Sequence, residues 1–181
     1  MKYLFILLSL LFVTVGNAAQ VDLKESEFGW YASKIGGEHF GKILLKEANL
    51  DEKEGKVVGG VFVMDMKSFT VENIDSAEYE TKFLNHMKSP DFFDMEKYPT
   101  ATLKINKVDG NNAEGVLTIK GRSNPINFTL EQNGELVTGK ITFDRTKYDM
   151  VYRSKNFFEN LGDKIIHDEV VLNFKIKIVE T

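Results

Sequence analysis

Three histidines and one strand-end Asp-Arg pair are the side chains of this chain best suited to acid–base or metal chemistry. His39, His86 and His167 lie far apart in the sequence and lack the short spacings typical of metal ligands. The sequence contains no Gly-x-Ser-x-Gly elbow, no Gly-Lys-Ser/Thr phosphate loop and no His-Glu-x-x-His motif. Asp144 and Arg145 are expected to form an ion pair that ties the edge of the fold. The sequence therefore predicts no catalytic residues and no metal site.

Aromatic side chains give a stronger signal, because many of them lie outside the strand-like segments. They are Phe83, Phe92, Phe93, Tyr98, Tyr148, Tyr152, Phe157 and Phe158. Aromatic residues in such places either seal one end of a core or line an apolar tunnel beneath a lid. The sequence leaves both interpretations open.

Alternating apolar residues indicate the half-buried strands that would carry these aromatic residues. The clearest rows are Phe28, Trp30 and Ala32; Val58, Gly60, Phe62, Met64 and Met66; and Val170, Leu172, Phe174, Ile176 and Ile178. Turn-forming residues separate such segments at 51–55, 109–112, 121–125 and 133–134. Gly59-Gly60 and Gly139 lie within strand-like segments and indicate sharp bends or close approach of another backbone, with ordinary bulges as the alternative.

One helix interrupts the strand pattern at residues 76–88. Asp75 or Ser76 is suited to its N-cap, and Pro90 is expected to end it. Tyr79, Phe83 and Met87 recur every four residues and predict one apolar side. A second short helical or irregular piece is expected at residues 156–163. A helix and aromatic segment feeding an antiparallel meander predicts a barrel with a covered opening.

The N-terminal segment predicts export. Residues 1–19 combine Lys2, an apolar run and small residues before a cleavage point after Ala18 or Ala19, as in a secretory signal peptide. The formal net charge of −4 becomes −5 without Lys2, and no basic stripe suited to nucleic acid is present. The chain has no cysteine, which excludes disulfides and thiolate sites. Residues 20–181 are expected to form one domain.

Ordered sequence pieces along the mature chain resemble the YceI-like family. The matching pieces are Trp30 with Lys34, 37–41, 59–66, 84–94, 98–101, 115–121, 143–148, 157–164 and the terminal strand. One departure is Asp149, where the family pattern usually has Gly after the aromatic residue. This family comprises exported bacterial proteins with a lipocalin-like barrel that bind polyisoprenoid or related long-chain lipids.

The resemblance implies a mainly β fold, a single eight-stranded antiparallel barrel with the 76–88 helix near one opening. The candidate cavity or lid residues are Trp30, Lys34, His39, Phe62, Met64, Phe83, Met87, Phe92, Phe93, Leu103, Leu117, Phe143, Tyr148, Tyr152, Phe157 and Phe158. Lys34 and His39 match family positions and are hypothesised to hold a phosphate or carbonyl head group. The alternative for His39 is a structural hydrogen bond at a strand turn.

The expected function is that of a periplasmic carrier rather than an enzyme. Its ligand would be an isoprenoid-tailed lipid, such as a quinone or polyprenyl phosphate, or a fatty chain, and no other cofactor is expected. Transient membrane contact and a homodimer are further expectations, whereas nucleic acid is not expected to bind. Two alternatives stay open: an enzyme that acts on such a lipid, with His39 and an acid, and a structural or stress protein whose own side chains fill the barrel.

Overall fold

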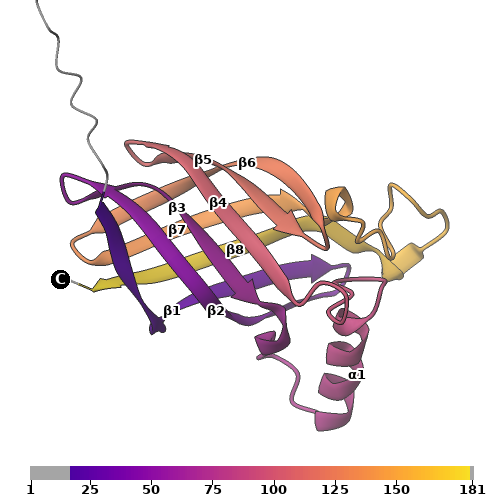
Figure 1. Cartoon of the computed structure of the whole chain (residues 1–181). Coiled ribbons are helices and arrows are strands. Elements are labelled where there is room, and N and C mark those ends of the chain that lie inside the picture. Colours follow the sequence, from indigo (N-terminus) through magenta and orange to yellow (C-terminus); the bar gives the residue numbers. More distant parts are fainter. Residues whose placement is uncertain (1–16, 180–181) are drawn as a thin grey trace, which may run out of the picture.

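Eight antiparallel strands form a closed barrel, and each strand pairs with its neighbours in sequence until β8 meets β1 (Figure 1). The computed structural model describes residues 17–179. The strands are β1 (Asn17–Lys34), β2 (Gly37–Lys53), β3 (Lys56–Asp65), β4 (Thr100–Asp109), β5 (Asn112–Ile119), β6 (Arg122–Asn133), β7 (Leu136–Asp144) and β8 (Ile166–Val179). The helical elements are η1 (Met66–Ser68), α1 (Ala77–Lys88), η2 (Arg145–Tyr148) and η3 (Gly162–Lys164). The predicted fold class is confirmed.

The expected leader lies outside the described residues up to position 16. Its last three residues, 17–19, form the start of β1 and pair with residues 50–52 of β2.

The helix and the long loops gather at one end of the barrel, which we call the mouth (Figure 1). The β3–β4 connection carries η1 and α1, and the β7–β8 connection carries η2 and η3. Tight turns join the strands at the other end (Figure 1). We refer to residues 66–99 and 145–165 together as the cap.

Phenylalanine rings fill the barrel interior behind the mouth. The ring of Phe28 lies 6.0 Å from that of Phe62 and 5.4 Å from that of Phe174, and Phe128 lies 6.0 Å from Phe174. Gly139 provides space for this cluster, because a Cβ there would lie 2.1 Å from Cζ of Phe174. The close backbone approach predicted at Gly139 is confirmed, because the same Cβ would lie 2.7 Å from the carbonyl oxygen of Thr129.

The register of β3 differs from the prediction at its start. Val57 is buried and Val58 is 38% exposed, whereas Val58 was expected to share a face with Phe62. The reason is a bulge at Val58, because the pairing with β2 shifts between Val57 and Gly59, and Gly60 nearby adopts a φ of 151°. A Cβ at Gly60 would lie 2.6 Å from the carbonyl oxygen of Asn49, so the close backbone approach predicted here is confirmed.

The segment after η1 lies across β2 near the mouth. The amide of Thr70 donates to the carbonyl oxygen of Lys42, and the amide of Glu72 donates to that of Phe40. The indole of Trp30 donates to the carbonyl oxygen of Thr70 at 2.9 Å. Gly41 permits this contact, because a Cβ there would lie 2.1 Å from the same oxygen.

Gly41→Ala is therefore expected to lower the free energy of unfolding by about 1–3 kcal/mol, as overpacking against backbone does. Urea denaturation measures the change. Gly29→Ala is the matched control, because a Cβ there would lie at an ordinary 3.7 Å from its nearest neighbour, the carbonyl oxygen of Asn173. Equal losses in the two variants would contradict the steric explanation.

Candidate functional site

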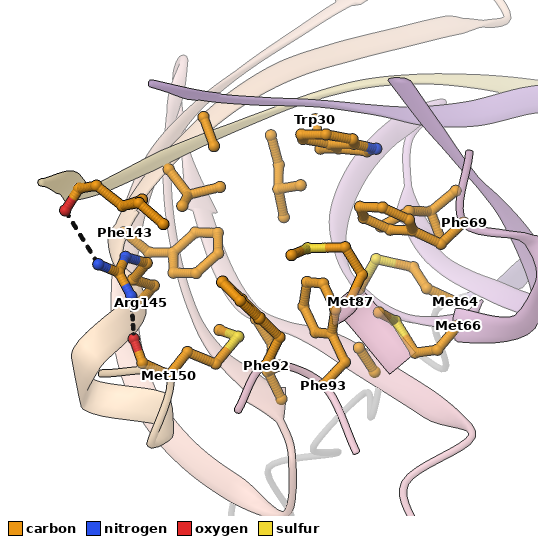
Figure 2. A pocket seen from close by; sticks show the side chains of 17 residues that line it. Trp30, Met64, Met66, Phe69, Met87, Phe92, Phe93, Phe143, Arg145 and Met150 are labelled. Atoms are coloured by element: carbon orange, nitrogen blue, oxygen red, sulfur yellow. Dashed lines mark hydrogen bonds between the residues drawn. The ribbon is translucent and has the colours of Figure 1, made fainter. Parts of the chain in front are cut away.

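An apolar cavity of about 80 Å³ lies inside the mouth, between the barrel wall and the cap (Figure 2). We call it the main cavity. Its lining residues are Trp30, Ala32, Ile43, Met64, Met66, Phe69, Met87, Phe92, Phe93, Ala101, Ile119, Phe143, Arg145, Met150, Ile166, Val170 and Leu172. Most of them occupy inward positions of strands, where the pleat directs every second side chain into the barrel.

The cap closes the main cavity with Met87, Phe92 and Phe93 (Figure 2). Ser76 caps α1 by accepting from the amide of Tyr79, and the helix ends at Lys88, so the predicted helix is confirmed. The chain then turns back, and the amide of Phe93 donates to the carbonyl oxygen of Met87. This turn brings both phenylalanines beneath the helix.

The predicted apolar side of α1 is wrong at one position. Tyr79 is 65% exposed, whereas Met87 is buried and Phe83 is half-buried. The first turn of the helix extends beyond the barrel rim, and only the C-terminal turns cover the cavity (Figure 1).

Arg145 is the only charged residue in the described lining, and protein groups engage its donors. Its guanidinium donates to the carbonyl oxygens of Met150, Ile166 and His167 and forms an ion pair with Asp168 at 3.1 Å. Burial lowers the pKa of Arg145, and the nearby carboxylates oppose that shift. The guanidinium therefore joins the start of β8 to the β7–β8 connection.

The predicted ion pair between Asp144 and Arg145 is wrong. The Asp144 carboxylate instead caps η2 by accepting from the amide and hydroxyl of Thr146. Asp168 is the actual partner of Arg145, and it also accepts from the hydroxyl of Ser154 at 2.7 Å. Asp144 ends β7 and Arg145 begins η2, so the Asp144 carboxylate serves as the η2 cap while Arg145 reaches Asp168 on β8.

Lys120 joins the two parts of the cap from the β5–β6 turn. Its ammonium donates to the carbonyl oxygens of Pro90 and Asp149. Asp149 adopts the left-handed conformation, with φ 63° and ψ 28°, that Asp tolerates better than most residues. The loop at this departure from the family pattern thus keeps a glycine-like backbone, and its carboxylate lies 3.4 Å from Lys120 and from Arg122.

A second pocket lies between the main cavity and the β1–β2 turn. Its lining residues are Trp30, Ala32, Ser33, Lys34, His39, Phe83, Met87, Phe92 and Ile166, so it shares five of them with the main cavity. The β1–β2 register explains the position of Lys34 and His39: His39 pairs with Ala32, and Lys34 lies two residues further along the same face.

Stacked rings lie where the second pocket adjoins the main cavity. The indole of Trp30 lies 4.6 Å from the ring of Phe69 and 6.2 Å from that of Phe83, nearly parallel to both. The imidazole of His39 lies 4.8 Å from Phe83. The second pocket is thus aromatic on its inner side and polar at the β1–β2 turn.

Comparison with known proteins identifies this architecture. The family model of the YceI-like domain matches residues 20–178. The chain belongs to the YceI-like family. A UPF0312 protein of Staphylococcus aureus is 39% identical over 75 residues, which are 35% of this chain and 44% of that protein. The chain thus spans less than half of the length of this relative.

Two solved structures share the YceI-like barrel. BcnA of Burkholderia cenocepacia has 22% sequence identity and a TM-score of 0.63, and the match covers 89% of this chain and all of BcnA. A polyisoprenoid binding domain from Saccharophagus degradans has 13% identity and a TM-score of 0.59, and the match covers 92% of this chain and 99% of that domain. At these identities the likeness shows the fold.

The YceI-like barrel brings together part of the predicted site. Trp30, Met64, Met87, Phe92, Phe93 and Phe143 line the main cavity, and Lys34, His39 and Phe83 line the second pocket with Trp30 and Met87. Phe62, Leu103 and Leu117 are fully buried and line neither. They lie deeper along the strands, where side chains fill the barrel.

Four aromatic candidates lie outside both pockets. Tyr148 packs edge-on against Phe143, and burial raises the pKa of its phenol to about 12. Tyr152 packs against His86 and Phe92, so that it joins the two parts of the cap. Phe157 is 57% exposed and Phe158 is 46% exposed. Both follow a turn in which their amides donate to the carbonyl oxygen of Ser154, so they project from the loop. Of the short helical or irregular piece expected at residues 156–163, only the end is helical, where η3 begins at Gly162.

Sequence reasoning missed part of the lining of the YceI-like cavity. Ala32, Val170 and Leu172 lie on predicted strand faces and could have been found from their period-two spacing. Met66 also lay on such a face. Met150 and Arg145 belong to the irregular β7–β8 connection, where no periodicity signals which way a side chain points.

Within residues 17–179 no cluster of three or more His, Cys, Asp or Glu side chains could hold a metal ion. No helix among the described residues has the length and apolar character needed to cross a membrane.

Proposed function

We propose that this YceI-like protein binds and carries an amphiphile with a long apolar tail, such as an isoprenoid-tailed lipid or a fatty chain. The observation that carries the proposal is the apolar main cavity, which α1 covers and which adjoins a second pocket lined by Lys34 and His39. The barrel fold shared with the polyisoprenoid binding domain of Saccharophagus degradans supports an isoprenoid tail. The leader-like residues 1–19 support a periplasmic location.

The cavity must widen to accept such a tail. Its volume of about 80 Å³ is well below the roughly 300–1,000 Å³ of ordinary ligand pockets. Met64, Met66, Met87 and Met150 line it, and unbranched methionine side chains change rotamer and fill irregular space easily. The tail is therefore proposed to displace these side chains with Phe92 and Phe93.

Moving the tail from a membrane into the barrel changes its free energy little. Burying each CH₂ from water yields about 0.8 kcal/mol, but a tail that leaves a bilayer is already out of water. The free energy of transfer for the tail is then near zero, so head-group contacts decide which lipid is taken. This balance suits a reversible carrier that contacts the membrane transiently.

A binding role is favoured over an enzymatic one by the lining of the main cavity. Among the described residues it contains no carboxylate, histidine or hydroxyl, and Arg145 is engaged by protein groups. The small cavity volume favours one other candidate, a structural barrel filled by its own side chains.

Native mass spectrometry of the protein, purified from a periplasmic fraction without detergent, tests the proposal. A discrete added mass that solvent releases as one prenyl or acyl species is expected. A bare mass that persists after incubation with a bacterial lipid extract would instead establish the filled barrel.

A further inference from the structure

A groove lined by both polar and aromatic side chains lies outside the barrel beside α1 and adjoins the second pocket. We call it the α1 groove. Its volume is about 530 Å³, and its lining residues are His39, Asn73, Ile74, Asp75, Ser76, Tyr79, Lys82, Phe83 and His86. His39 and Phe83 line both the groove and the second pocket. The main cavity, the second pocket and the α1 groove therefore adjoin one another in series, from the barrel interior to the surface.

We infer that the α1 groove holds the head group of the bound amphiphile and selects an uncharged head group with a hydroxyl. In this inference Nε2 of His39 accepts the hydrogen bond of that hydroxyl. The inference rests on the proposed function, because the tail must occupy the barrel for the head group to reach the groove.

Asn73 fixes the tautomer of His39. The side-chain amide of Asn73 donates to the carbonyl oxygen of Glu38 at 2.9 Å, which assigns its nitrogen to that side. Its oxygen therefore faces Nδ1 of His39, at 3.2 Å, and can only accept. A neutral His39 accordingly carries its proton on Nδ1 and presents Nε2 as a bare acceptor.

Nε2 has no hydrogen-bond partner among the described residues. An acceptor of this kind pairs with an O–H group and repels a ketone oxygen or a fully ionised phosphate. Phe83 packs against the ring and holds its plane. His39 thus distinguishes a hydroxyl from its ether or carbonyl counterpart.

The charges of the α1 groove also disfavour an anionic head group. Lys82 is the one lysine in its described lining, and the Glu78 carboxylate already pairs with it at 2.6 Å. Asp75 adds a negative charge, and Nε2 of His86 lies 3.2 Å from Asp91. A diphosphate needs several unpaired cations or forked arginine donors, which this lining lacks.

Lys34 lines the second pocket, and its positive charge would also attract an anionic head group. One lysine offers a single point charge, which can donate to a hydroxyl oxygen but does not supply the several cations that a diphosphate needs. Lys34 and His39 together form a donor and an acceptor, which is the pairing that a hydroxyl requires.

Three probes with one tail test the inference: farnesol, farnesyl methyl ether and farnesyl diphosphate. Titration calorimetry is expected to show farnesol binding about fivefold to tenfold more tightly than the methyl ether, the size of one net hydrogen bond. The diphosphate is expected to bind more weakly than farnesol. His39→Leu should remove the preference for farnesol over the ether and keep the affinity for the ether.

Two further variants sharpen the test. His39→Gln restores an acceptor oxygen and should recover part of the preference. His167→Leu is the matched control, because this exposed histidine bonds to Ser33 and lines neither the groove nor the second pocket. It should leave the preference unchanged.

Equal binding of farnesol and its ether by the wild type, or tightest binding of the diphosphate, would overturn the inference and leave the carrier function standing. Failure of all three probes to bind would count against the carrier function itself. Two-bond ¹⁵N–¹H spectra of the histidines give an independent readout. The Nδ1–H tautomer is expected for His39, and the Nε2–H tautomer would contradict the assignment.

Discussion

Arg145→Met is expected to lower the free energy of unfolding by about 3–5 kcal/mol, the usual loss when one partner of a buried ion pair is removed. Arg145 is 2% exposed. Without its guanidinium, the carbonyl oxygens of Met150, Ile166 and His167 lose their donor, and the Asp168 carboxylate loses its counter-ion. Chemical denaturation with urea measures the loss.

Arg122→Met is the matched control for Arg145. Arg122 also pairs with an aspartate, Asp149, at 3.4 Å, but both side chains are more than half exposed. An exposed ion pair contributes about 0–1 kcal/mol, so this variant should unfold almost like the wild type. If Arg145→Met were as mild as Arg122→Met, the guanidinium would not be the anchor of the β7–β8 connection.

Ala101→Phe is expected to reduce the lipid content of the purified protein to less than about a tenth of the wild-type value. Ala101 lies on β4 opposite Met64 and lines the main cavity. A phenyl ring at this position would occupy the space of about 80 Å³ that a tail must enter. Overpacking is expected to cost about 1–3 kcal/mol of stability, which leaves a folded barrel for native mass spectrometry.

Ala113→Phe separates cavity blocking from general damage. Ala113 is buried on β5 opposite Phe128, and it does not line the main cavity. This variant should lose a similar amount of stability and retain its lipid. Equal lipid content in the two variants would show that the tail does not enter the main cavity.

Local patterns in the sequence were sufficient to predict the elements of this fold. The helix was expected at residues 76–88 and forms at Ala77–Lys88, because a Ser N-cap and a following Pro act on the adjacent backbone alone. Period-two rows likewise placed Trp30 and Leu172 on inward faces. The bulge at Val58 shifted one such row, because an inserted residue changes the phase of the alternation.

The sequence could not predict which part of the barrel interior is filled by side chains and which part contains the main cavity. Phe62 and Met64 are both inward residues of β3, two positions apart, yet only Met64 lines the main cavity. Alternation tells which face a residue occupies, whereas its depth along the barrel depends on the shear of all the strands. Phe157 and Phe158 show the same limit in a loop, because no period indicates whether an irregular segment turns inward.

The sequence by itself determined the strands, the helix and the family, because caps, turns and alternating residues act over a few positions and the family pieces occur in order. The tertiary structure alone decided which distant side chains meet. Arg145 pairs with Asp168, 23 residues away, rather than with its neighbour Asp144, and His39 meets Asn73 across 34 residues. Closure of the barrel and the path of the cap set those contacts, because they bring together segments whose separation along the chain carries no local signal.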